Sequence, residues 1–200
     1  MLKLDKLPLL ILIIFMFNGI ILLKEYYALE DIEYVFAEAS RNSERLSLII
    51  NSIILIFIAL MGLKRIYNRE NLRNAFRILV TIFALNHLFH FFYGIMYFYF
   101  QSWDIASIEN VHGYITLISI ILFPIILWKV NKLNKVFYFG IILHLFNVSF
   151  YISETFYKRF TLPDPDYIHK TGMVIMAVLL FLVLFKEFKE RSKKLVRKKD

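Results

Sequence analysis

The chain has 200 residues, of which 59% are hydrophobic and 20% are charged. Soluble domains are about half apolar and about a quarter charged, so this composition and the mean hydropathy of +0.60 exclude an ordinary soluble protein and indicate a membrane protein. The chain carries a net charge of +8 and no cysteine, which excludes disulfides, iron–sulfur clusters and thiolate metal sites.

Six segments are long and apolar enough to cross a bilayer, whose hydrocarbon core of ~30 Å needs ~20 helical residues. We predict membrane helices over about residues 7–23, 46–65, 76–102, 110–129, 136–157 and 167–188. The first is expected to be an uncleaved anchor, because no small-residue cleavage site follows it. Since no linker rich in Gly, Ser or Pro interrupts the chain, residues 1–200 are predicted to form a single transmembrane domain, ending in a basic tail over 189–200.

The charges between the predicted helices alternate in sign along the chain. Segments 64–77, 129–135 and 186–200 are net positive, 24–45 and 104–109 are net negative, and 154–170 is neutral. By the positive-inside rule, both termini are predicted to be cytoplasmic, and most of the positive charge is an orientation signal. No nucleic-acid partner is therefore expected. The basic tail is also suited to contact anionic lipid.

All five histidines lie on the last four predicted helices, and none lies in a predicted cytoplasmic loop. Ionisable residues at membrane depth are rare and usually functional. His87 and His144 lie at similar depths when counted from the cytoplasmic ends of their helices, and His112 and His169 both open their helices from the outer side. The histidines are therefore expected in two layers. His90 is a fifth histidine, on nearly the same helix face as His87.

The two layers are related by one spacing, because His87 and His144, like His112 and His169, are 57 residues apart. This spacing is consistent with a duplicated helical hairpin. It is equally expected of any two hairpins that span the same bilayer, and both interpretations stay open.

Four glycines lie next to these histidines or one helical turn from them: Gly94, Gly113, Gly140 and Gly172. A glycine in such a position leaves room for a flat macrocycle against the backbone. The alternative is that small residues simply allow membrane helices to pack closely.

Neutral imidazoles offered from opposite helices of a bundle suit a low-spin haem with two axial ligands. In an up-and-down bundle the third and fifth helices run in the same direction, as do the fourth and sixth. His87 or His90 is then expected to face His144, and His112 to face His169. Two haems at different depths would form a path for electrons across the membrane.

Residues 78–188, which contain these four helices, resemble the core of the cytochrome b561 superfamily. The residues that carry the resemblance are His112-Gly113 opening a helix that continues to Pro124, Phe137-Tyr138 ahead of His144, and His169 followed by Gly172. The resemblance implies two b-type haems, whose iron ligands would be His87, His112, His144 and His169. The chain departs from the family in three respects. The two helices without histidine come first, whereas six-helix members usually carry their ligands on the central four. His90 is an additional histidine that could replace His87 as a ligand, and the inner histidine layer lies within the membrane rather than at the cytoplasmic interface.

The resemblance implies transmembrane electron transfer from ascorbate or a similar donor to ferric iron or monodehydroascorbate, and thus an oxidoreductase. It is also compatible with the membrane part of a larger redox protein or a homodimer. Donor and acceptor are not specified by the sequence, and no separate catalytic residue is predicted. The fold expected is an all-α, six-helix integral membrane bundle whose histidine-bearing core is formed by the last four helices, most naturally in the plasma membrane.

Two other functions fit the same residues. A histidine-lined metal-ion or proton transporter would explain histidines at several depths, but such transporters normally use membrane-embedded Asp or Glu, and none is predicted deep in a span. A membrane scaffold or sensor would give the histidines no chemical role. The acidic segment 25–44 is expected either to cover an outer haem pocket or to form a soluble surface.

Overall fold

A computed structural model of the chain describes residues 4–102, 111–158 and 167–196. In these residues all regular secondary structure is helical. After a single 3-10 turn (Leu4–Lys6), the helices are α1 (Leu7–Ala28), α2 (Ile32–Met61), α3 (Leu63–Asn68), α4 (Glu70–Phe100), α5 (Val111–Lys129), α6 (Lys135–Lys158) and α7 (Tyr167–Val196). All of these except α3 are long and apolar enough to cross a membrane, so the predicted helical membrane bundle is confirmed.

Two helices run further than expected. α2 begins at Ile32 rather than near residue 46, and α7 continues to Val196, into the segment expected to be a tail. Most of the acidic segment 25–44 therefore lies in the first half of α2, where Val35, Ala39 and Ser43 recur on one buried face and Glu33 and Glu38 are at least partly exposed.

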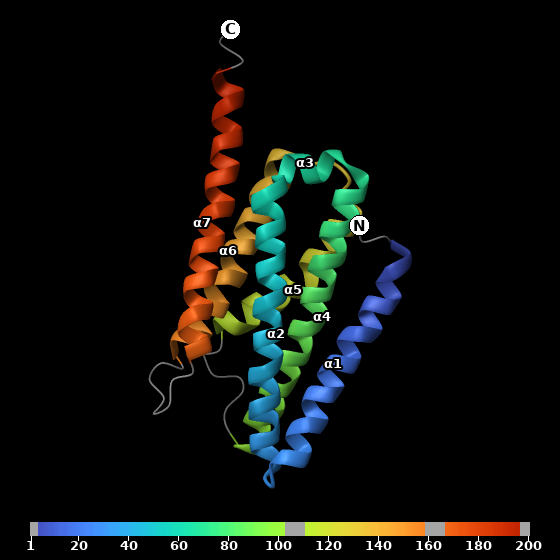
Figure 1. Cartoon of the computed structure of the whole chain (residues 1–200), viewed down its shortest axis with the longest axis vertical. Coiled ribbons are helices and arrows are strands. Elements are labelled where there is room, and N and C mark those ends of the chain that lie inside the picture. The colour runs from blue at the N-terminus through green and yellow to red at the C-terminus, as the bar shows by residue number, and fades with distance from the viewer. Residues whose placement is uncertain (1–3, 103–110, 159–166, 197–200) are drawn as a thin grey trace.

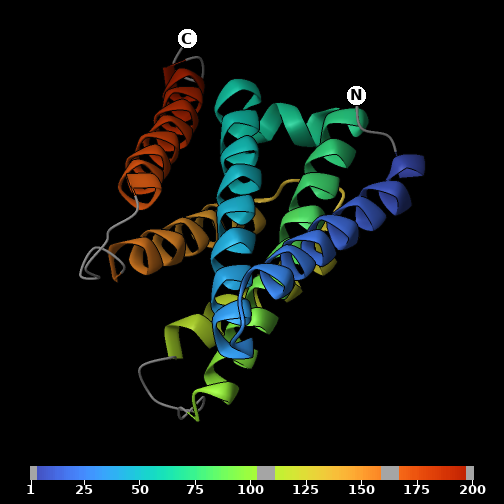
Figure 2. The ribbon, with the colours of Figure 1, turned by 60° about the horizontal axis from the view of Figure 1, so that its bottom comes forward.

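The helices form a ring in which α2 has a central place. α2 packs against α4 on one side and α7 on the other, and α5 and α6 close the ring between α4 and α7. α1 lies outside this ring, against α2 and α4 (Figures 1 and 2). The four histidine-bearing helices α4, α5, α6 and α7 thus do not close on themselves, because α2 separates α4 from α7.

The two ends of the bundle differ in charge. α3 lies across one end, where the chain also enters α1 and leaves α7 (Figure 1). We call this the basic end, because Lys64, Arg65 and Arg69 lie there. We call the other end, at the turn between α1 and α2, the acidic end, after Glu30 and Asp31.

Arg77 fastens α4 to the end of α5 at the basic end. Its guanidinium donates to the backbone oxygens of Leu127 and Val130 at 2.9 Å each and to Oδ1 of Asn131 at 3.0 Å. It also lies 5.3 Å from the ring centre of Trp128. Hydrogen bonds from a charged group to carbonyl oxygens satisfy the free end of a helix and stabilise more than neutral ones.

Glu187 of α7 fastens α3 and α6 at the same end. Its carboxylate accepts the backbone N–H of Leu63 at 2.7 Å and the hydroxyl of Tyr138 at 3.0 Å. The chain reaches Leu63 through Gly62, whose φ of +74° breaks the helix between α2 and α3. A methyl group at Gly62 would meet the carboxylate of Glu190 at 2.5 Å.

Gly62→Ala is expected to lower the free energy of unfolding by about 1–3 kcal/mol, because a side chain is strained at positive φ and the Glu190 carboxylate must move. Gly19→Ala in α1 is the control, since a methyl group there meets nothing within 4 Å. Thermal unfolding in detergent should show a lower midpoint for the first variant alone. Equal midpoints would show that the turn at Gly62 is not constrained.

Candidate functional site

α2 presents a buried polar face to the helices packed against it. The residues on this face are Ser40, Ser43, Glu44, Ser47 and Asn51, all buried. Their spacing of three or four residues places them on one side of a helix. Towards the basic end the same side continues with Ile54, Leu55 and Ile58, so the polar part of the interior ends near the middle of the bundle.

Two asparagines connect this face to α1 and α4. Nδ2 of Asn18 donates to Oδ1 of Asn86 at 2.8 Å, and Ser43 donates to Oδ1 of Asn18 at 2.9 Å. Nδ2 of Asn86 donates to the backbone oxygen of Ser43 at 2.9 Å and to Oγ of Ser47 at 2.8 Å. Each buried amide is therefore paired, as an apolar surrounding requires.

His87 and His90 of α4 are held by serines of α2. Nδ1 of His87 lies 2.9 Å from Oγ of Ser47, and Nδ1 of His90 lies 3.2 Å from Oγ of Ser40. The two imidazole rings are 5.0 Å apart, and both residues are buried. In the described part of the chain, Nε2 of His87 is buried without a hydrogen-bond partner.

Glu44 brings a carboxylate into the interior. It is 1% exposed, and its Oε1 accepts a hydrogen bond of 2.6 Å from the hydroxyl of Thr155 on α6. From the sequence, Glu44 is expected to precede the second membrane helix, whereas α2 begins at Ile32 and includes it.

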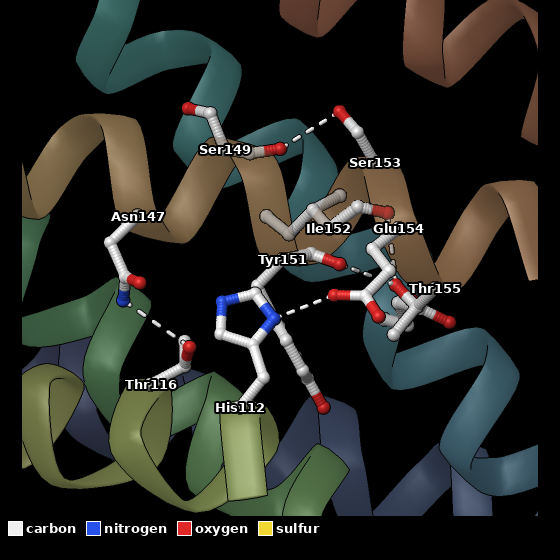
Figure 3. Close-up of polar contacts among 10 residues, drawn as sticks. His112, Thr116, Asn147, Ser149, Tyr151, Ile152, Ser153, Glu154 and Thr155 are labelled. Carbon is white, nitrogen blue, oxygen red and sulfur yellow. Dashed lines mark hydrogen bonds and ion pairs between the residues drawn. The ribbon is translucent and has the colours of Figure 1, made fainter. Parts of the chain in front are cut away.

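A second carboxylate pairs with a histidine nearer the acidic end. Nδ1 of His112 on α5 lies 2.6 Å from Oε2 of Glu154 on α6 (Figure 3). These side chains are 33% and 30% exposed. The ring of Tyr151 lies 5.5 Å from that of His112 and 6.2 Å from that of His87, so it connects the partly exposed pair to the buried histidine.

We call these residues together the acid–histidine cluster. Its members come from α2, α4, α5 and α6, and they are Glu44, His87, His90, His112, Tyr151, Glu154 and Thr155. Sequence reasoning identified the three histidines but missed both carboxylates and the tyrosine. The signal for Glu44 was present in the spacing of the Ser, Glu and Asn residues over positions 40–51.

The other two histidines lie apart from this cluster. Nδ1 of His144 lies 2.8 Å from Oγ of Ser119, and its ring stacks on Phe123 of α5 at 3.7 Å. It lines a groove of about 470 Å³ between α5 and α6. His169 is buried, with its ring 5.0 Å from that of Phe156 on α6.

The structure does not bring the expected histidine pairs together. The ring and hydrogen-bond contacts of His87 do not include His144, and those of His112 do not include His169. The expected pairing assumed that the four histidine-bearing helices close on themselves, whereas α2 lies between α4 and α7 in the ring. Among the residues described, no group of three or more His, Cys, Asp or Glu side chains is placed to hold a metal ion.

The glycines beside the histidines mostly allow close packing. A methyl group at Gly172 would clash with the ring of Phe156. One at Gly113 would meet the hydroxyl of Tyr151 at 3.5 Å, and one at Gly94 the hydroxyl of Ser40 at 3.8 Å. A methyl group at Gly140 meets nothing within 4 Å, and this residue lines the His144 groove.

No protein-family model, no curated protein and no solved structure matches this chain. The resemblance to the cytochrome b561 superfamily therefore stays a prediction, and the cluster is interpreted from its own chemistry.

Asn86→Ala is expected to lower the free energy of unfolding by about 2–4 kcal/mol, because it removes three buried hydrogen bonds and leaves Asn18 and Ser43 with unmet polar groups. Asn147→Ala is the control, since its amide makes one hydrogen bond, to Thr116. Unfolding in mixed micelles should separate the two variants clearly. A smaller loss for Asn86→Ala than for Asn147→Ala would show that the amides do not join α1, α2 and α4.

Proposed function

We propose that this protein moves protons across the membrane and that the acid–histidine cluster is its internal proton-binding site. The observation that carries the proposal is the buried carboxylate of Glu44, hydrogen-bonded to Thr155 at 2.6 Å and placed on the same helix face as the serines that hold His87 and His90. Ionisable groups within membrane helices are costly, and they mark proton and ion pathways in pumps and transporters.

The chemistry of the cluster suits protons. Carboxylates and imidazoles bind and release protons within the biological range of pH, and hydroxyl groups both donate and accept hydrogen bonds. The hydroxyl oxygen of Ser47 accepts a hydrogen bond from Asn86, so the hydroxyl hydrogen of Ser47 is available to Nδ1 of His87. If the Ser47–His87 hydrogen bond reverses, Nδ1 carries the hydrogen and the imidazole of His87 changes tautomer. The partly exposed His112–Glu154 pair, which lies nearer the acidic end than His87, would be the entrance for protons.

The remaining half of the interior supplies a barrier. Between the cluster and the basic end the interior is filled by buried apolar side chains, among them Ile54, Ile58, Phe76 and Leu127. Apolar constrictions exclude water and ions, and they gate membrane pathways. A proton bound at Glu44 is therefore reached from the acidic end, and its release to the other side requires this apolar layer to open.

The charge pattern indicates the side from which the cluster is reached. By the positive-inside rule the basic end would be cytoplasmic, so the cluster would exchange protons with the outside of the cell. Transport of a metal ion is less well supported, because the described residues offer no group of three ligating side chains.

Electron transfer through haem is the second candidate, and one observation favours it. The Nδ1 of His87 is held by Ser47 while its buried Nε2 has no partner among the described residues, which is how a metal-ligating histidine is oriented by its neighbours. His87 therefore fits one axial ligand. A pairing of His87 with His144 has less support, because the contacts of His144 are with Ser119 and Phe123 of α5.

Glu44→Gln is expected to abolish proton flux, because the amide keeps the hydrogen bond to Thr155 but does not ionise. The measurement is acidification of liposomes that contain the purified protein and a pH-sensitive dye, driven by a potassium diffusion potential. Glu38→Gln is the matched control on α2, since Glu38 is partly exposed and pairs with Arg41. The proposal would be refuted if liposomes with the unaltered protein showed no more proton flux than empty liposomes. It would also be refuted if Glu44→Gln showed the same flux as the unaltered protein.

The absorption spectrum of the protein from haem-sufficient cells tests the second candidate. If electron transfer is the function, reduced haem bands should be present, lost in His87→Leu and retained in His90→Leu. Proton movement predicts a colourless protein that is active in the flux measurement. A coloured protein without proton flux would make haem chemistry the better account.

A further inference from the structure

A groove at the basic end lies between the α2–α3 turn and α7. It has a volume of about 800 Å³, and its polar lining includes five cationic side chains against one carboxylate, Glu190. The cations are Lys64, Arg65, Arg69, Lys186 and Lys189. Glu190 lies 3.5 Å from Lys186, so one acid offsets only part of the positive charge.

The same groove has an apolar wall. Leu60, Leu182 and Phe185 line it, and these side chains are 65%, 44% and 55% exposed. They belong to α2 and α7, within or next to the segments long enough to span the membrane. The wall therefore faces lipid chains while the cations lie where the helices leave the membrane.

The groove is held in shape by contacts that do not use its cations. The positive φ of Gly62 sets the direction in which α3 leaves α2. Glu187 of α7 then accepts the N–H of Leu63 and keeps α3 across the end of the bundle, where Figure 1 shows it. Ile66 and Tyr67 of α3 are buried beneath, which leaves Lys64 and Arg65 exposed towards the outside.

We propose that this groove binds an anionic phospholipid of the adjoining leaflet. The phosphate and the anionic headgroup would lie among the cations of α3 and α7, and the acyl chains would lie along the apolar wall. Basic pockets between membrane helices on the cytoplasmic side bind anionic headgroups, and each nearby Lys or Arg contributes to that attraction. A soluble phosphate would satisfy the cations alone and make no use of the wall.

Native mass spectrometry of the full-length protein, stripped of lipid in detergent, tests the proposal. The probes are phosphatidylglycerol, phosphatidylcholine with the same acyl chains, and inorganic phosphate as a competitor. One phosphatidylglycerol should be retained in preference to phosphatidylcholine, and phosphate should not displace it. Arg65→Gln combined with Lys189→Gln should weaken phosphatidylglycerol binding roughly thirty-fold, since each charge contributes roughly a factor of five.

Lys6→Gln combined with Lys129→Gln is the matched control. It removes the same charge from exposed lysines at the same end, just before α1 and at the end of α5, which do not line the groove, and should leave binding unchanged. Helical content and gel-filtration profiles of both variants establish that they fold. Equal binding of the two lipids, displacement by phosphate, or an equal loss in the control would overturn the proposal.

Discussion

The structure depends on the pairing of the buried polar face of α2. In a bilayer no water is available to a buried hydroxyl, amide or carboxylate, and each one left without a partner costs about 1–3 kcal/mol or more. Ser43, Ser47 and Glu44 therefore determine which helices can lie beside α2. α1 and α4 bring Asn18 and Asn86, and α6 brings Thr155. The hydrophobic character of the helices keeps them in the membrane, whereas these bonds specify their neighbours.

The same face divides the interior into two halves with different roles. Towards the acidic end, the ring of Tyr151 lies against those of His87 and His112, and the pair of His112 and Glu154 is partly exposed. Towards the basic end the interior is apolar and is fastened by Arg77 and Glu187. A polar site reached from one side and sealed from the other is what a protein that controls proton movement needs.

Hydropathy predicted the number and approximate ends of the membrane helices, because the apolar length needed to cross a bilayer is a property of local sequence. Hydropathy did not predict the start of α2, because the acidic residues of its first half lower the mean hydropathy there although one face of the helix is buried. The depth of the histidines follows from counting residues, but the direction in which each one points depends on which helices are neighbours. α2 lies between α4 and α7, which the sequence did not reveal, and the ring of His144 lies against Ser119 and Phe123 of α5.

The central claim is that Glu44 binds and releases a proton inside the bundle. Infrared difference spectroscopy of the protein in lipid, titrated with pH, observes this directly through the C=O stretch of a protonated carboxylic acid. The account predicts a carboxylic-acid band that appears and disappears with pH, shifts in heavy water, is absent in Glu44→Gln and persists in Glu38→Gln. A spectrum in which the unaltered protein and Glu44→Gln show the same carboxylic-acid bands would contradict it.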